Sequence, residues 1–332
     1  HLVEAGATLD AREHTRGQTA LMWAIAERHA AIVELLADRG ADVHLRSSER
    51  PRRIHTRTAG FEPTGVFDTS QGGNSAILFA ARHGDVESAR HLVAAGADVH
   101  NASPMGNTAL VVAAMSGHEA MATYLLAEGA DPNASDAGYT ALHGAILRGD
   151  TDLARALLDA GANPDQAIEQ GSPGRRNSPD FVLEHDVVGA TPFWLAAHFG
   201  RPGIMRMLTE HGADASMTTD SGTTALLAAI ATRQRVEPGL AADPVEQQRV
   251  VREAAEAALD AGVDVAKADA TGTTGLHSAA RRRYGSVIRL LVERGAHLEA
   301  EDAQGRTPLA LAGGADDDNA SVRLLKELGA TR

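Results

Sequence analysis

The chain has 332 residues, a formal charge of −13 at pH 7 and no cysteine, and only 3% of its residues are aromatic. The negative charge disfavours a general nucleic-acid binder, because phosphate contacts need basic surface. Without cysteine there is no disulfide, no thiolate metal site and no cysteine nucleophile. No apolar run approaches the roughly 18 residues of a membrane span, so we expect no membrane insertion. With 43% apolar residues and few rings, alanine and leucine must fill the core, which predicts closely packed helices.

One sequence motif recurs along the chain. It reads GNTALVVAAMSGHEAMATYLLAEGADPN at residues 106–133 and GYTALHGAILRGDTDLARALLDAGANPD from residue 138. Its anchor is a Thr or Ser, followed by a small residue or proline and then an apolar pair. The anchors are Thr19, Ser75, Thr108, Thr140, Thr191, Thr224, Thr274 and Thr307. A spacing near 33 residues, interrupted by three longer intervals, predicts a repeat protein with three insertions.

The repeats follow one another from end to end. A partial repeat at residues 1–13 lines up with residues 290–302, so the chain opens halfway through a repeat, and we expect further sequence upstream. Eight repeats follow, starting near residues 17, 73, 106, 138, 189, 222, 272 and 305. We therefore expect a single repeat array over residues 1–332.

Each repeat predicts two helices. The anchor Thr suits an N-cap, where its hydroxyl accepts a hydrogen bond from the first helical turn, and Pro192 and Pro308 then take the first helical position. The first helix is short and rich in alanine, as at Ala113-Ala114. The second helix has an i, i+3, i+4 apolar stripe and ends at a glycine suited to a left-handed C-cap. These glycines are Gly40, Gly96, Gly129, Gly161, Gly212, Gly262 and Gly295.

The first two insertions, at about residues 45–72 and 166–188, follow the end of a second helix, which places both in loops on the same rim of the array. Both carry arginines: residues 46–57 of the first hold Arg46, Arg50, Arg52, Arg53 and Arg57 against Glu49, and the second holds Arg175 and Arg176. Arginines in an acidic chain indicate a site for an anionic partner. The alternative is that both loops are only solvated or mobile.

The third insertion, at about residues 233–243, falls between the two helices of the sixth repeat and therefore at the opposite rim. Asp243-Pro244-Val245-Glu246 predicts a capping box at the start of a longer helix that runs to about Ala261. We expect a structural role for this insertion.

The motifs resemble ankyrin repeats. The resemblance rests on T-A-L-H at Thr140 to His143, on the alanine pairs, on Gly117-His118 and on endings such as Gly129 to Asn133. It implies an all-α repeat solenoid of stacked helix-turn-helix units with projecting hairpin loops. The motif histidine is kept at His143 and His277, and its replacement elsewhere predicts that part of the hydrogen bonding between repeats is lost. The replacements are Met22, Leu78, Val111, Trp194, Leu227 and Ala310.

The long loop insertions also resemble those of alanine-rich bacterial multi-ankyrin proteins, many of which are exported. This resemblance implies a bacterial protein and favours a periplasmic or extracellular location over the cytoplasm. It implies no particular molecular role.

No catalytic or metal-binding pattern is complete. His118-Glu119 begins an H-E-x-x-H zinc motif, but residue 122 is alanine. Glu184-His185-Asp186 and His198 offer metal ligands, with a loop histidine beside carboxylates as the alternative. The chain has neither a G-x-x-x-x-G-K phosphate loop nor a G-x-S-x-G nucleophile elbow. We therefore expect no enzyme, no bound metal and no cofactor.

The resemblance also implies a binding groove lined by the first helices and the loop tips. It points to the two residues after each alanine pair and to residues at the loop tips. In this chain they include Arg82, His83, Met115, Leu147, Arg148, His198, Phe199 and, at a loop tip, Tyr139. Rings beside arginines are typical of interaction hot spots, although Phe199 and Met115 have packing between repeats as their alternative. Arg281 and Arg282 hold the same position in the seventh repeat and are predicted to be solvated, and Trp23 and Trp194 to be core.

We therefore expect a monomeric, non-enzymatic scaffold that binds another protein along the groove of the second to fifth repeats. The insertion arginines Arg50, Arg52 and Arg53 are expected to contribute to binding of this partner. Two alternatives stay open. One is a receptor for a small anionic ligand, and the other is the targeting part of a longer protein whose active domain lies upstream.

Overall fold

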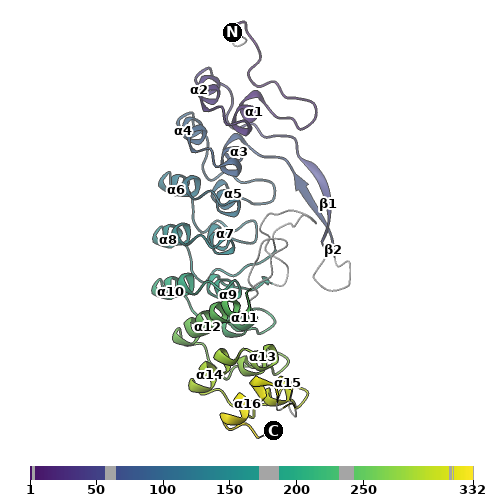
Figure 1. The fold of residues 1–332 in the computed structure, drawn as a ribbon. Helices are drawn as coiled ribbons and strands as arrows, with labels where there is room; N and C mark the ends of the chain where they lie inside the picture. Colours follow the sequence, from purple (N-terminus) through teal and green to yellow (C-terminus); the bar gives the residue numbers. More distant parts are fainter. Residues whose placement is uncertain are drawn as a thin grey trace. The chain divides into compact units, whose positions relative to one another are not determined.

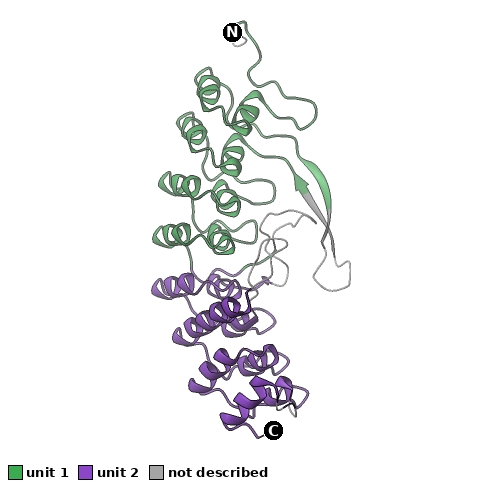
Figure 2. Cartoon of the chain, in the orientation of Figure 1, with its two compact units in different colours: residues 1–163, 168–186 green, residues 164–167, 187–332 purple. Residues whose placement is uncertain are grey.

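The computed structural model describes residues 1, 4–56, 65–171, 187–231, 243–313, 316 and 318–331. These residues form short helix-turn-helix pairs and divide into two compact units (Figures 1 and 2). Unit 1 comprises residues 1–163 and 168–186, and unit 2 comprises residues 164–167 and 187–332. The predicted all-α repeat fold is confirmed, with one β-hairpin added to it.

Unit 1 holds four helix pairs within its described residues. They are α1 (Ala20–Ala26) with α2 (Ala30–Asp38), α3 (Ala76–His83) with α4 (Val86–Ala94), α5 (Ala109–Ser116) with α6 (Glu119–Ala127), and α7 (Ala141–Arg148) with α8 (Thr151–Asp159). The first helices contact one another in order, α1 with α3, α3 with α5 and α5 with α7. Figure 1 shows them along one side of the unit, with the second helices along the other.

The first insertion forms a hairpin on the side of the first helices (Figure 1). Its strands are β1 (Arg50–Thr56) and β2 (Gly65–Gln71), which pair antiparallel from Arg50↔Gln71 to Thr56↔Gly65. An isolated bridge between Arg46 and Ser75 continues the pairing to the start of α3. The sequence predicted a projecting loop here and did not show whether its residues pair as strands. The described residues satisfy their backbone groups across two strands instead, which the sequence analysis missed.

Unit 2 also holds four helix pairs within its described residues. They are α9 (Pro192–His198) with α10 (Pro202–Glu210), α11 (Ala225–Ala231) with α12 (Pro244–Asp260), α13 (Gly275–Arg282) with α14 (Gly285–Glu293), and α15 (Pro308–Ala312) with α16 (Ala320–Glu327).

Helix α12 is the longer helix predicted after the third insertion. Asp243 is its N-cap and accepts the Val245 N–H at 2.9 Å, with Pro244 at the first position. The predicted capping box is wrong, because the Glu246 carboxylate accepts from Arg249 Nε and Nη2 at 2.7 and 2.6 Å, one turn further along the helix. Residues 232–242 of the insertion lie outside the described residues.

Seven of the eight anchor residues cap the first helices, as predicted, and Ser75 is the exception. Thr140 forms a capping box with His143, whose Nδ1 accepts the Thr140 N–H at 3.1 Å. In six repeats the anchor hydroxyl accepts the backbone N–H three residues later: these anchors are Thr19, Thr108, Thr191, Thr224, Thr274 and Thr307. Ser75 differs because its hydroxyl donates to Asn101 Oδ1 at 2.9 Å, in the loop that precedes the next repeat. Ser75 therefore joins two repeats instead of capping its own helix.

Hydrogen bonds at the motif-histidine position link consecutive repeats. His277 Nδ1 accepts the Thr274 N–H at 3.2 Å, so Nε2 carries the proton and donates to the Arg306 carbonyl at 3.0 Å. Trp194 stands at the same position, and its Nε1–H donates to the Thr223 carbonyl at 2.9 Å. Each acceptor directly precedes the next anchor. The expectation that the link is lost at Trp194 is therefore wrong, because an indole N–H replaces the imidazole N–H.

Small side chains bring neighbouring first helices close together. A Cβ on Gly144 of α7 would lie 3.1 Å from the Met115 nitrogen and 3.3 Å from the Ala114 carbonyl carbon of α5. Ala113 and Ala114 are fully buried. This close approach agrees with a core filled by alanine and leucine instead of rings.

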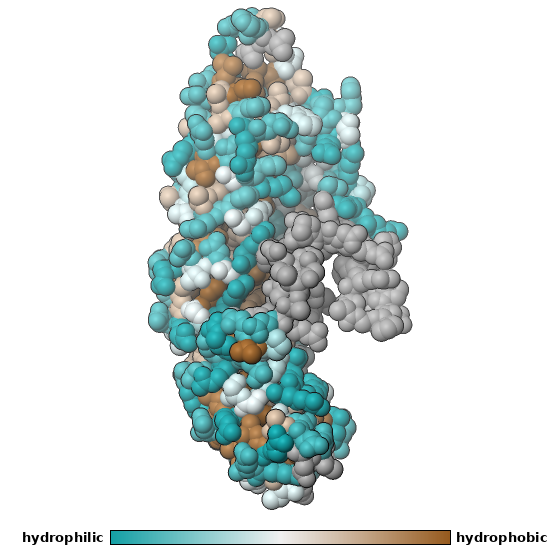
Figure 3. Space-filling view, in the orientation of Figure 1, coloured by the Kyte–Doolittle hydropathy of each residue, from teal (hydrophilic) through white to brown (hydrophobic). Residues whose placement is uncertain are grey.

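The two tryptophans occupy different surroundings. Trp194 is 5% exposed, as predicted for a core residue, but Trp23 is 46% exposed. Trp23 corresponds to Leu195, which is fully buried in unit 2. In the described residues before α1 there is no helix to cover this face. Ile32 and Leu35 of α2 are also exposed, and apolar atoms gather at this end of unit 1 (Figure 3).

We predict that Trp194→Phe lowers the free energy of unfolding by about 1–3 kcal/mol, because the half-buried Thr223 carbonyl loses its donor. Trp23→Phe is the matched control and should change the same free energy by less than about 0.5 kcal/mol, because Trp23 is largely exposed. Urea unfolding followed by circular dichroism measures both. Equal effects of the two substitutions would contradict the assigned hydrogen bond.

Candidate functional site

The predicted contact residues of unit 1 lie at opposite ends of the first helices. Arg82 and His83 end α3, and Met115 and Arg148 lie at the ends of α5 and α7. The hairpin arginines Arg50, Arg52 and Arg53 stand on the other rim, where the first helices begin. Arg82, Arg50 and Arg53 are exposed, while His83, Met115, Arg148 and Arg52 are half-buried.

Two predicted contact residues of unit 1 are buried. Leu147 is fully buried within α7, which packs on α8, so it serves the core. Tyr139 is 3% exposed, and its hydroxyl donates to Asn107 Oδ1 at 2.8 Å in the preceding repeat. Burial raises the pKa of the Tyr139 phenol to about 12. Both predictions are wrong, because spacing along the chain does not show on which side of a loop or helix end a side chain lies.

Arg148 forms a clamp between two repeats. Its Nε and Nη2 donate to the Met115 carbonyl at 2.9 and 2.7 Å. The guanidinium also covers Gly117, where a Cβ would lie 3.2 Å from Nη1. The cation thus satisfies a carbonyl at the C-terminal end of α5, where the helix dipole favours positive charge.

Two further side chains, not predicted as contacts, make the same kind of clamp. His118 Nε2 lies 3.0 Å from the Arg82 carbonyl, and its ring packs on Gly84. Arg28 Nη2 donates to the His83 carbonyl. We call Arg28, Arg82, His83, His118 and Arg148 the basic stripe of unit 1. Gly117-His118 was the available sequence signal for one member, but nothing in the repeat pattern marked Arg28.

Arg28 of the basic stripe has an unusual backbone conformation. Its φ is 58°, in the turn between α1 and α2. The corresponding residues of the next three repeats are Gly84, Gly117 and Gly149, with φ of 65°, 76° and 72°. A residue with a side chain adopts this left-handed region at a cost of about 1–2 kcal/mol. The only other described residue with a side chain in this conformation is Arg283 of unit 2, at φ 60°.

The basic stripe has a positive local environment. Partial burial lowers the pKa of His83, and the charges of Arg82, Arg28 and His118 lower it further, while only Asp85 acts in the opposite direction. Asp85 is already engaged as the N-cap of α4, where it accepts from Ser88 N and Oγ. Among the described residues, no ion pair involves Arg28, His83 or His118.

The base of the hairpin is held by Arg46. Its Nη1 donates to the Gly73 and Ala102 carbonyls, both at 2.8 Å, and its Nη2 donates to Asn101 Oδ1 at 2.9 Å. The Ser48 N–H donates to the Arg16 carbonyl at 2.7 Å. Arg46 was grouped with the arginines for an anionic partner, and this prediction is wrong because its guanidinium is committed to the fold. Arg57, Arg175 and Arg176 lie outside the described residues.

In unit 2, three aromatic rings follow one another at the C-terminal end of α9. Trp194 stacks on His198 with ring centroids 5.2 Å apart, and His198 meets Phe199 edge-on at 5.0 Å. His198 and Phe199 are half-buried. Glu184-His185-Asp186, which were considered with His198 as metal ligands, lie outside the described residues. Elsewhere in the described chain, no three His, Asp or Glu side chains are grouped to hold a metal ion.

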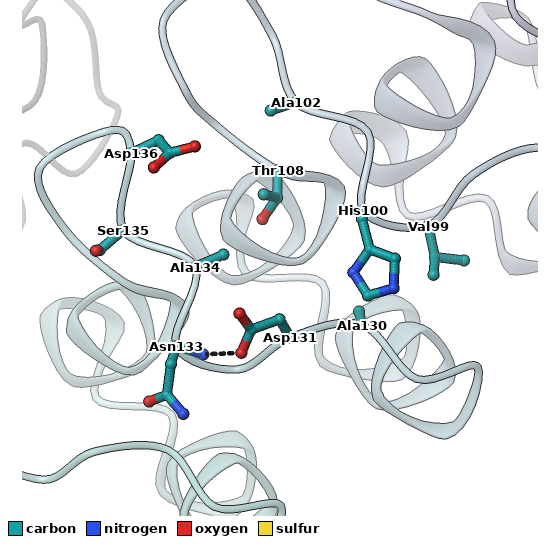
Figure 4. Close-up of a pocket in the computed structure, with 10 residues that line it drawn as sticks. All are labelled: Val99, His100, Ala102, Thr108, Ala130, Asp131, Asn133, Ala134, Ser135 and Asp136. Carbon is teal, nitrogen blue, oxygen red and sulfur yellow. Dashed lines mark hydrogen bonds between the residues drawn. The ribbon is translucent and has the colours of Figure 1, made fainter.

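A hollow lies between two consecutive loops of unit 1, those that follow α4 and α6 (Figure 4). Its polar lining includes His100, Ser135, Asp131 and Asp136. Asp131 accepts the Asn133 N–H at 2.9 Å. Two carboxylates make this hollow unsuited to an anion.

None of the helices in the described ranges has both the length and the apolar character to cross a membrane.

Comparisons with known proteins identify the repeats. A family model described as "Ankyrin repeats (3 copies)" matches residues 68–168, and a model of the single "Ankyrin repeat" matches residues 16–48, 188–220 and 271–303. Among solved structures, the ankyrin repeat domain of human ASB11 matches with a TM-score of 0.58 and 24% sequence identity. The match covers 78% of this chain and 100% of that one, and it shows a shared fold. No curated protein matches the chain.

We predict that Arg46→Met releases the hairpin, because three hydrogen bonds to its base are lost at once. The Gly73 and Ala102 carbonyls lose their Arg46 donor, while Asn101 Oδ1 keeps the Ser75 hydroxyl. The free energy of unfolding should fall by about 1–3 kcal/mol, and proteolysis within residues 50–71 should become faster. Arg50→Met is the matched control and should change neither, because Arg50 is exposed. The assigned role of Arg46 is wrong if both variants are cleaved at the rate of the wild type.

We predict that one of the three tyrosines ionises near pH 12 and that Tyr139→Phe removes this step. The fold disfavours the phenolate, so the contribution of Tyr139 to stability is complete below about pH 10 and is lost as the pH rises towards 12. Tyrosine-labelled NMR titration measures the step. An unchanged set of titrations in the variant would show that another tyrosine is the buried one.

Proposed function

The chain belongs to the ankyrin-repeat family, and we propose that it is a non-enzymatic scaffold that binds another protein through unit 1. Ankyrin repeats generally mediate protein–protein interaction, and the proteins that contain them are typically non-enzymatic. The described chain departs from a plain array in two features of unit 1: the basic stripe and the hairpin. We assign the binding surface to these features.

The observation that carries the proposal is the fixed geometry of the basic stripe. Carbonyls at the ends of α3 and α5 hold the side chains of Arg28, His118 and Arg148. A long cationic side chain normally loses rotamer entropy when it contacts a partner, at about 0.5–1.5 kcal/mol each. Side chains that the fold already holds have lost that freedom before binding, so their contacts with a partner cost less.

The hairpin adds a second contact region on the opposite rim. Each first helix of unit 1 has seven or eight residues, so about 12 Å of helix separates the two rims. Arg50, Arg52 and Arg53 lie on the part of the hairpin that follows the Arg46 anchor. A partner that contacts both regions covers the first-helix side of unit 1.

His198 and Phe199 are proposed as a separate contact within unit 2. Their rings are half-buried and pack against each other and Trp194, so they offer a rigid aromatic surface. Packing between repeats remains the alternative role for both.

Capture from an extract of the source organism tests the proposal. The bait variant carries Arg50→Glu, Arg53→Glu and Arg82→Glu, all at exposed positions. Its matched control carries Arg281→Glu and Arg282→Glu, which reverse charge at the corresponding helix end of unit 2. We expect the wild type and the control to capture the same protein, quantified by mass spectrometry, and the triple variant to lose it.

Three results would count against the scaffold. Capture of the same protein by all three baits would exclude the unit 1 surface. Loss of the captured protein with the control bait alone would place the binding site in unit 2. Empty capture together with a thermal shift of the wild type by phosphate or citrate would favour a receptor for a small anion.

A further inference from the structure

We propose that the basic stripe of unit 1 recognises an extended, carboxylate-rich segment of the partner protein. The inference rests on the proposed scaffold function and names the chemistry of the segment that the stripe receives. It goes beyond the predicted groove contacts, since two of the five stripe residues, Arg28 and His118, were not among them.

The first argument is local charge. The chain as a whole carries −13, so its mean field repels an anionic segment. The basic stripe nevertheless gathers three arginines and two histidines over four consecutive repeats, from Arg28 to Arg148. The carboxylate that acts on the pKa of His83 is Asp85, which accepts two hydrogen bonds from Ser88 in the first turn of α4 and so is only partly available to neutralise the stripe.

The second argument is the number of donors that remain on a fixed cation. Arg28 is exposed and uses Nη2 for the His83 carbonyl, while a guanidinium has five N–H donors. Its plane is therefore held in position with donors still directed to solvent. Paired N–H groups of this kind match the two oxygens of a carboxylate.

The third argument is the backbone at Arg28. Glycine would relieve the left-handed conformation there, as it does in the next three repeats. The strained position instead carries a cation that contacts the end of α3. Strain of this size that is not needed for folding is found where a side chain has a function.

The dimensions favour an extended chain. Helices of adjacent repeats pack about 10 Å apart, so four repeats span about 30 Å. About ten residues of extended peptide cover this distance. The stripe has no phenyl or indole ring on which bases could stack, which favours carboxylates over a single-stranded nucleic acid.

The pH dependence follows from the surroundings of His83. The groups that face it are Arg82 on its own helix, Arg28 from the α1–α2 turn, His118 from the α5–α6 turn and Asp85 from the α3–α4 turn. Partial burial and three of these four groups lower the pKa of His83 in the free protein, which favours its neutral form. A bound carboxylate reverses that balance, so the bound segment favours protonated His83 and affinity rises as the pH falls.

The test uses a fluorescein-labelled peptide of about 12 glutamates and fluorescence anisotropy on the full chain. We expect wild type to bind, with affinity falling steeply between about 50 and 500 mM salt and rising from about pH 8 to about pH 5.5. Arg82→Glu/His83→Glu should weaken binding about tenfold or more. The matched control Arg281→Glu/Arg282→Glu should change it less than about twofold.

A second variant separates binding from folding. Arg28→Gly removes one cation while placing glycine where the backbone is left-handed, so it should weaken peptide binding without lowering thermal stability. Equal peptide affinity of the wild type, Arg82→Glu/His83→Glu and Arg28→Gly would overturn the inference. Tighter binding of an oligothymidylate of the same charge would also overturn it, in favour of a nucleic acid.

The two proposals fail in different ways. If the glutamate peptide does not bind, yet capture from extract still requires Arg50, Arg53 and Arg82, the scaffold stands and the acidic segment is wrong. If capture is empty and the peptide also fails to bind, both proposals are wrong.

Discussion

Among the described residues, no helix pair can bury its apolar face by itself, and each helix pair depends on burial against a neighbouring pair. Apart from α12, the helices have five to nine residues, too few for stable isolated helices in water. Packing at Gly144 shows how closely the first helices must approach. In unit 2, hydrogen bonds from Trp194 and His277 then join their helix pairs to the start of the next repeat. Each repeat is therefore stabilised mainly by its interfaces with the adjacent repeats.

This dependence leaves the ends of the helices available for other roles. The helix faces are committed to packing, but the last carbonyls of each first helix need donors from outside the helix. In unit 1 these donors are Arg28, His118 and Arg148, each supplied by an adjacent repeat. The same bonds that satisfy the helix ends therefore arrange cations in a row. The same hydrogen bonds therefore end the first helices and hold the side chains of the basic stripe in place.

Local signals were sufficient for most of the helix boundaries. A Thr hydroxyl caps the first helix in six repeats, and Gly40, Gly96 and the corresponding glycines have positive φ where the second helices end. These depend on the nearest few residues. The failures concern residues whose surroundings come from another repeat. Trp23 lacks a covering helix, Tyr139 turns inward to Asn107, and Arg46 reaches across two loops to the Ala102 carbonyl.

The sequence by itself determined the repeat, the two helices of each unit and the family, because capping, apolar periodicity and turn glycines act over a few residues. It also showed that the first insertion is basic within an acidic chain. Only the tertiary structure decided which arginines serve the fold and which face solvent, and that Arg28 joins Arg82, His83 and His118 in one stripe. These residues are up to 90 positions apart in the chain, and the stacking distance between repeats brings them together.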